Sequence, residues 1–152
     1  KTMVSHIPMA LAETFHFSGG GEPLLCSEAM PIISYVNEAF PWVKIIIRTN
    51  GLLLERCAKE LARMKIARLE ISLHATAQTN DMILQRKGSQ AIFEGIARLR
   101  KYLEEYGTHM YIDFHPAVSL LNKSEVPLLI KKAHELKVHE EETDGPDRDV
   151  QV

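Results

Sequence analysis

Ser18-Gly19-Gly20-Gly21-Glu22-Pro23-Leu24-Leu25 directly follows an apolar, strand-like run, Thr14-Phe15-His16-Phe17. Three glycines at the end of a buried strand leave backbone N–H groups uncovered, so a ligand can sit against the main chain. The carboxylate of Glu22 stands beside that opening and suits a cationic group such as an ammonium. Because α/β folds place their sites at the carboxyl ends of parallel strands, this corner predicts a small-molecule site.

Outward from this corner, short apolar runs alternate with segments of helical periodicity. Three further short runs are predicted strands, at 43–47, 69–73 and 110–114, the first of them strongly β-branched, and Val138 is a candidate start of a fifth. Apolar residues at helical spacing predict helices over 29–40, 54–62, 92–106 and 126–136. Ser27 and Ser124 are the predicted caps of the first and last helices. The segment from about His74 to Gly88 is predicted to be a loop.

Alternating strands and helices predict an α/β fold with parallel strands and right-handed crossovers. Two architectures fit this pattern: a doubly wound open sheet, and part of a (βα) barrel. Four or five units are too few for a complete eight-unit barrel, which needs ~250 residues. A barrel would therefore be partial, an incomplete TIM-like barrel. Residues 1–138 are the expected domain, and the acidic residues 139–152 are a predicted tail or linker.

Composition excludes several classes of protein. The net charge of -2 and the lack of a basic stripe leave no evident nucleic-acid patch. No apolar run is long enough for a membrane span, so no membrane partner is expected. Cys26 and Cys57 are too few for a disulfide framework or a zinc site. We therefore expect a cytoplasmic protein without a metal site of its own.

Several motifs, taken in order, resemble the radical S-adenosylmethionine (radical SAM) superfamily. Phe17-Ser18-Gly19-Gly20-Gly21-Glu22-Pro23 follows the first strand, Arg48-Thr49-Asn50-Gly51 follows the second and Ile71-Ser72-Leu73-His74 ends the third. Asn80-Asp81 and Arg86-Lys87-Gly88-Ser89 then precede a long helix that opens Ala91-Ile92-Phe93. A lone Gly-Gly-Glu is a weak signal, whereas the ordered set is specific and covers most of the chain.

The resemblance implies a partial barrel whose first βα unit is missing, and a site for S-adenosylmethionine. The glycines would let the backbone meet the methionine part of the cofactor, with the glutamate in the same cradle. The strand-end serine and histidine match positions that contact the ribose or carboxylate, and an arginine suits a carboxylate because the two pair in a bidentate fork. The residues implied on the cofactor side are Gly20, Gly21, Glu22, Asn50, Ser72, His74 and Arg86. No catalytic residue is assigned.

The cysteines depart from the family pattern. The family holds a [4Fe-4S] cluster with a CxxxCxxC loop placed before the Gly-Gly-Glu strand, but no cysteine precedes Cys26 in this sequence. A cubane cluster needs thiolates close together, and Cys26 and Cys57 are far apart in the sequence. The cluster ligands are therefore expected outside this chain, and a missing first unit is the favoured explanation, over a member that has lost the cluster.

Two hypotheses for function follow from this resemblance. In the first, the chain is a segment of a radical SAM enzyme that binds S-adenosylmethionine at the Gly-Gly-Glu strand end for reductive cleavage at the cluster, and this segment alone is inactive. In the alternative, it is a degenerate, cluster-less barrel scaffold for binding or assembly, and an exposed edge strand predicts a homo-oligomer. A nucleotide-binding sheet of flavodoxin or Rossmann type is the structural runner-up, but Glu22 beside the glycines would repel phosphate.

The substrate is not assigned by this sequence, because a fold does not fix a function. Three polar residues flank the fourth predicted strand, namely His109, Asp113 and His115. Asp113 and His115 share one face by the two-residue period of a strand. We interpret them as polar residues on the substrate side.

Overall fold

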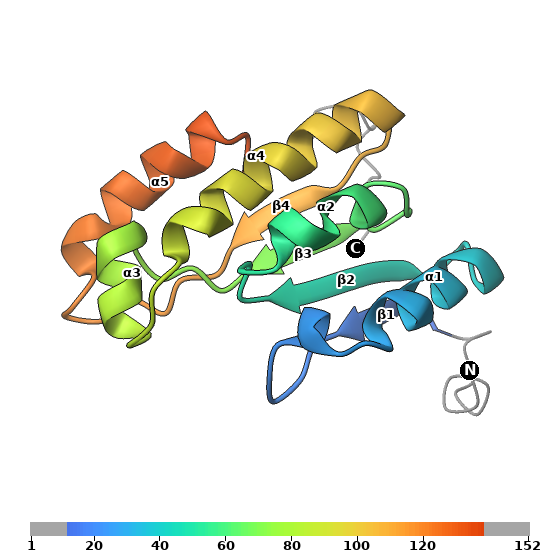
Figure 1. Ribbon diagram of the computed structural model, residues 1–152, viewed down its shortest axis with the longest axis horizontal. Helices are drawn as coiled ribbons and strands as arrows, with labels where there is room; N and C mark the ends of the chain where they lie inside the picture. The colour runs from blue at the N-terminus through green and yellow to red at the C-terminus, as the bar shows by residue number, and fades with distance from the viewer. Residues whose placement is uncertain (1–11, 139–152) are drawn as a thin grey trace, which may run out of the picture.

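The computed structural model describes residues 12–138. Its four strands form one parallel sheet in the order β1-β2-β3-β4, which is also their order along the chain. The strands are β1 (Thr14–Phe17), β2 (Lys44–Thr49), β3 (Arg68–Ile71) and β4 (Tyr111–Phe114). The helices are α1 (Ala29–Ala39), α2 (Leu54–Leu61), α3 (Ala77–Ile83), α4 (Ser89–Tyr106) and α5 (Val126–Glu135), as Figure 1 shows. Short 3-10 helices, η3 (Pro23–Leu25) and η4 (Lys123–Glu125), lie ahead of α1 and α5.

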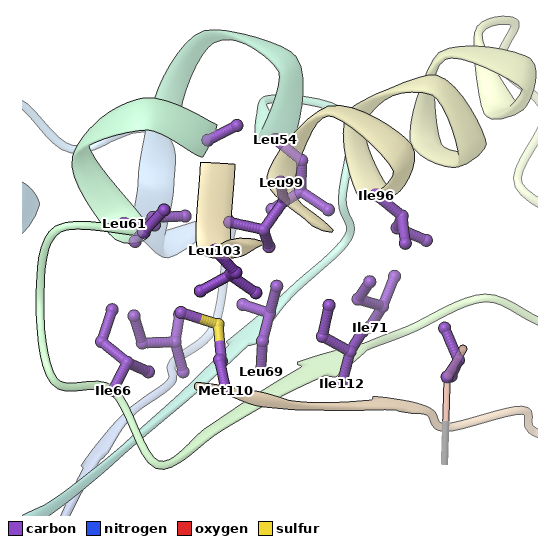
Figure 2. Close-up of a cluster of buried hydrophobic side chains, with 14 of the residues drawn as sticks. Leu54, Leu61, Ile66, Leu69, Ile71, Ile96, Leu99, Leu103, Met110 and Ile112 are labelled. Carbon is purple, nitrogen blue, oxygen red and sulfur yellow. The ribbon is translucent and has the colours of Figure 1, made fainter. Parts of the chain in front are cut away.

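The hydrophobic core lies between one face of the sheet and the helices. Alternate residues of each strand point to that face, and the helices present apolar stripes at helical spacing. Figure 2 shows leucines and isoleucines of α2 and α4 over side chains of β3 and β4. The fully buried members of this cluster include Ile45, Ile47, Leu54, Leu61, Leu69, Ile71, Ile96 and Leu99. Burial of these side chains is the main stabilising contribution to the fold.

The other face of the sheet, which we call the open face, is polar. Its residues are His16, Lys44, Ile46, Arg48, Arg68, Glu70, Tyr111 and Asp113, with His115 just beyond β4. Figure 1 shows α1, α2 and α4 over the opposite side, and no helix within residues 12–138 packs on the open face. Each strand therefore separates core residues from polar ones by simple alternation.

Within residues 12–138, the sequential strand order and the helices on one face of the sheet favour part of a (βα) barrel over a doubly wound sheet. Flavodoxin and Rossmann sheets reverse their strand order at a switch point and carry helices on both faces. The strands described here show no reversal. The predicted α/β class with parallel strands is confirmed, and the nucleotide-binding runner-up loses its structural basis. Val138, the candidate start of a fifth strand, is a buried turn residue instead, and the predicted tail, 139–152, lies outside the described residues.

All four predicted strands form, but some boundaries differ from the sequence pattern. The third strand ends at Ile71 instead of residue 73, although Leu73 stays buried. The predicted serine caps are wrong, because α1 and α5 begin after Glu28 and Glu125 without a side-chain cap. Both helices begin at the predicted residues, 29 and 126, so Ser27 and Ser124 lie two residues before the helix start, in a turn and in η4, instead of at the cap position.

The predicted loop before the longest helix contains α3. This helix has seven residues, and its one buried side chain is the polar Asn80, so it offers no apolar stripe for a sequence pattern to detect. Tertiary contacts hold it instead. Thr76 and Thr79 donate hydrogen bonds from their hydroxyls to Glu125, at the start of α5. These bonds lower the pKa of Glu125, with the Thr76 hydroxyl as the larger cause.

None of the helices within residues 12–138 has the length and apolar content that a bilayer crossing requires.

Candidate functional site

Glu22 joins the carboxyl ends of β1 and β2. Its Oε1 accepts hydrogen bonds from the backbone N–H of Leu24, at 3.0 Å, and from the Thr49 hydroxyl, at 2.6 Å. Its Oε2 accepts the backbone N–H of Asn50 at 2.7 Å. A carboxylate offers about four acceptor positions, so one remains for a ligand. Glu22 therefore fixes the geometry of this corner and still presents negative charge there.

The glycine loop, residues 19–21, borders a hollow of about 200 Å³. The residues that line this hollow are Phe17, Ser18, Gly19, Gly21, Glu22, Pro23 and Cys26. A methyl group added to any of the three glycines would have no heavy atom of another residue within 4 Å, and none of them has a positive φ. Neither packing nor backbone conformation therefore requires glycine here. Their visible effect is to leave the main chain open to the hollow.

His74, two residues beyond Ser72, is held on three sides. Its backbone N–H donates to Asn80 Oδ1 at 2.9 Å, and its carbonyl accepts from Asn122 Nδ2 at 2.7 Å. Its ring Nδ1 accepts the backbone N–H of Ala117 at 3.0 Å. Because Nδ1 is an acceptor, the ring proton lies on Nε2, which is left as a hydrogen-bond donor.

A polar network behind His74 also fixes the turn that carries Arg86. The Asn80 amide donates to Ser89 Oγ at 2.7 Å, and the Asp81 carboxylate accepts the backbone N–H of Ser89 at 2.9 Å. Hydrogen bonds from Ser89 lower the pKa of Asp81. The Arg86 N–H donates to the carbonyl of Asp81, and its side-chain Nε is buried with no acceptor in the part of the chain described. An unpaired buried donor of this kind is suited to an anionic ligand group.

The predicted site residues form two groups along the carboxyl ends of β1, β2 and β3. The first contains the glycines, Glu22 and Asn50, which are in direct hydrogen-bond contact through Glu22 and Asn50. Ser72 continues the ladder beside it, since its N–H donates to the carbonyl of Thr49. The second contains His74 and Arg86, linked through Asn80, Asp81 and Ser89. No hydrogen bond or ion pair joins the two groups directly among residues 12–138, and their roles toward a ligand remain predictions.

Residues 10–120 match the sequence family described as the Radical SAM superfamily. The chain belongs to the radical SAM superfamily. A probable GTP 3',8-cyclase of Thermococcus kodakarensis is 30% identical over 95 residues, which are 61% of this chain and 30% of that protein. The chain therefore spans about 30% of the length of this curated relative. The predicted resemblance is confirmed at the level of the superfamily.

Sequence reasoning missed three side chains that position the candidate site residues. Thr49, Asn80 and Asn122 are almost fully buried polar residues whose bonds hold Glu22, His74 and the loop after β4. Thr49 and Asn80 stand inside the quoted motifs, so their signal was present in the sequence. Asn122 had none, because it contacts His74 from a loop 48 positions away.

The described residues do not fit the [4Fe-4S] cluster of radical SAM proteins. Cys26 is exposed and Cys57 is half-buried on α2. Burial is the main cause that raises the pKa of the Cys57 thiol, which disfavours the thiolate that a cluster needs. No group of three His, Cys, Asp or Glu side chains within residues 12–138 is placed to hold a metal ion.

Replacing Glu22 with glutamine is expected to lower both stability and ligand binding. The amide nitrogen cannot accept a hydrogen bond, so Thr49, Asn50 or Leu24 loses its acceptor, at a cost of about 1–2 kcal/mol in the free energy of unfolding. Chemical denaturation measures this loss. The exposed Glu28→Gln variant is the control, and equal stability of the two variants would contradict the role of Glu22.

Proposed function

We propose that this chain is a segment of a radical SAM enzyme and binds S-adenosylmethionine along the carboxyl ends of β1, β2 and β3. The observation that carries the proposal is the glycine loop, which neither packing nor conformation requires, beside a carboxylate fixed at the ends of two strands. In this proposal, a [4Fe-4S] cluster with ligands from outside this chain would supply the electron for reductive cleavage of the cofactor. That chemistry belongs to the cofactor and the cluster, while this chain supplies binding and orientation.

The amino-acid part of S-adenosylmethionine carries one ammonium and one carboxylate. The remaining acceptor position of Glu22 binds the ammonium, and the exposed backbone at Gly20 and Gly21 lies along the methionine chain. Arg86 has a buried donor with no acceptor among residues 12–138, which suits the carboxylate. The two charges of the ligand thus meet opposite charges at the two groups of the site.

The ribose offers hydroxyl groups, which need donors and acceptors of fixed direction. The Nε2 donor of His74 is oriented by its Nδ1 bond to Ala117. Ser72 and Asn50 follow β3 and β2 at the same edge and are both half-buried. We assign these three side chains to the ribose or the carboxylate of the cofactor.

Replacing Gly21 with leucine tests the proposal. The added side chain has no neighbour in the protein within 4 Å of its Cβ, so the fold is expected to tolerate it. It occupies the hollow beside Glu22, so the affinity for S-adenosylmethionine is expected to fall by at least ~tenfold, as for loss of a well-packed contact. Equilibrium dialysis with radiolabelled S-adenosylmethionine measures the dissociation constant. Ala39→Leu, which adds the same exposed side chain on α1, is the matched control.

The alternative, a cluster-less scaffold for binding or assembly, makes the opposite prediction for the same titration. A scaffold without a cofactor site shows no saturable binding of S-adenosylmethionine, and Gly21→Leu then changes nothing. The predicted homo-oligomer is a separate question, since β1 and β4 each have one unpaired edge within the four described strands. Light scattering that shows a strict monomer at high concentration would contradict the predicted homo-oligomer.

The partial barrel is part of the same proposal. Four strands in sequential order, with their helices on one face, are what consecutive units of a (βα) barrel provide. In such a barrel the open face lines the interior.

A further inference from the structure

On the open face of the sheet, the acidic side chains are more deeply buried than the basic ones. Its two carboxylates lie deep, since the side chains of Glu70 and Asp113 are 8% and 15% exposed. The two guanidinium groups and the imidazole above them are accessible, with the Arg48, Arg68 and His115 side chains 49%, 46% and 41% exposed. The surface that a ligand meets is therefore composed of guanidinium and imidazole groups.

Each arginine is anchored by its acid on one side only. Nε and Nη2 of Arg48 both donate to Glu70 Oε2, at 2.8 and 2.7 Å, which leaves Nη1 without an acceptor among residues 12–138. Nη1 of Arg68 contacts Asp113 Oδ2 at 2.8 Å, and its guanidinium carbon lies 5.9 Å from the centre of the Tyr111 ring. Anchored guanidiniums lose little rotamer entropy when they bind a ligand, because their orientation is already set.

The strand register places the two arginines side by side. Arg48 pairs with Glu70, and Arg68 lies two residues before Glu70 on the same strand. Diagonal neighbours on adjacent strands have Cα atoms ~7–8 Å apart, within the combined reach of two arginine side chains. With Lys44, the fixed cations outnumber the two carboxylates by three to two, before either histidine is protonated.

Stability alone gives little reason for these ion pairs. Half-exposed pairs contribute only ~0–1 kcal/mol to folding, and an apolar row would bury more area. The ion pairs do, however, hold the guanidinium groups of Arg48 and Arg68 as exposed, oriented hydrogen-bond donors. We propose that Arg48 and Arg68 bind an oxyanion group, a phosphate or a carboxylate, of the molecule on which this protein acts. That this molecule is the substrate of an enzyme rests on the proposed function, whereas the binding of an oxyanion does not.

Isothermal titration at low ionic strength tests this, with tripolyphosphate and tricarballylate as the two probes. Wild-type protein is expected to bind at least one of them saturably, and the tighter probe identifies phosphate or carboxylate as the preferred group. Arg48→Gln and Arg68→Gln are each expected to weaken that binding by at least ~tenfold, as for loss of a charge-assisted hydrogen bond. Higher salt is expected to weaken it as well.

Arg98→Gln is the matched control. Arg98 has the same exposure, 51%, and an ion pair of 3.0 Å with Glu55, but it lies on α4, on the helix side of the sheet. Its substitution is expected to leave the affinity within ~twofold of wild type. Because Arg48→Gln leaves Glu70 without its arginine, the Arg48→Gln, Glu70→Gln double variant, which removes both charges, checks that the loss comes from the guanidinium.

The inference is overturned if neither probe saturates wild-type protein, or if Arg98→Gln weakens binding as much as Arg68→Gln. S-adenosylmethionine binding, measured on the same samples, separates this result from the proposed function. Normal S-adenosylmethionine binding without oxyanion binding removes only the inference. Oxyanion binding without S-adenosylmethionine binding retains the oxyanion site and removes the proposed function.

Discussion

Replacing Gly95 with valine is expected to destabilise the protein by about 3 kcal/mol. Gly95 lies where α4 crosses the start of α2, and a Cβ atom there would be 2.8 Å from Leu54 Cβ and 3.0 Å from the backbone nitrogen of Glu55. Backbone cannot move aside as a flexible side chain can, so the two helices must separate. That separation would loosen the core beneath them, where Leu54 and Leu99 are fully buried (Figure 2).

Thermal unfolding followed by circular dichroism measures this effect, and a shift of about 6–12 °C in Tm is expected for a chain of this size. Ala97→Val is the matched control, because Ala97 is exposed on the same helix. It changes helix propensity by only ~0.5 kcal/mol. Equal Tm values for the two variants would show that the helices do not cross as described.

Replacing Asn80 with leucine is expected to cost about 3 kcal/mol and to weaken cofactor binding in the same variant. Asn80 is fully buried, accepts the His74 N–H at 2.9 Å and donates to Ser89 Oγ at 2.7 Å. Leucine has similar bulk but leaves both groups buried without partners. The main chain at His74 then shifts, so the Nε2 donor proposed for the cofactor loses its orientation.

Asn37→Leu is the control for this prediction. Asn37 also bridges backbone groups, those of Lys65 at 3.0 and 3.3 Å, but it does so near the surface, where water replaces the lost bonds. Denaturant unfolding of both variants, together with S-adenosylmethionine titration, measures the difference. A small and equal loss of stability in the two variants would contradict the structural role of Asn80.

The sequence predicts the strands well because each is a short run with apolar residues, bounded by turn or helix signals. Residues 44–49 illustrate this, since three consecutive isoleucines fit poorly on an exposed helix. Helix α3 escaped prediction because polar hydrogen bonds hold it, and the bond from Thr79 to Glu125 spans 46 positions of the sequence. Local patterns report burial of apolar side chains, and they do not report polar contacts made by folding.

The sequence predicts where the candidate site residues lie relative to the strands, but not the hydrogen bonds that hold them. The glycines and Glu22 are correctly placed at a strand end, because a strand followed by glycines defines that point. The three bonds that Glu22 makes to Leu24, Thr49 and Asn50 required the pairing of β1 with β2, which no local pattern contains. Sequence therefore located the acid and could not show that it also joins two strands.

Because helices cover only one face of the sheet, the two faces of each short strand are under different structural constraints. Residues such as Leu69 and Ile112 must remain apolar and well packed, whereas their neighbours Arg68 and Asp113 are excluded from the core. Exchanging both members of an open-face ion pair together, so that no largely buried carboxylate loses its partner, costs little folding free energy. The ligand preference of this scaffold can therefore be changed by substitutions on the open face, without redesigning the hydrophobic core.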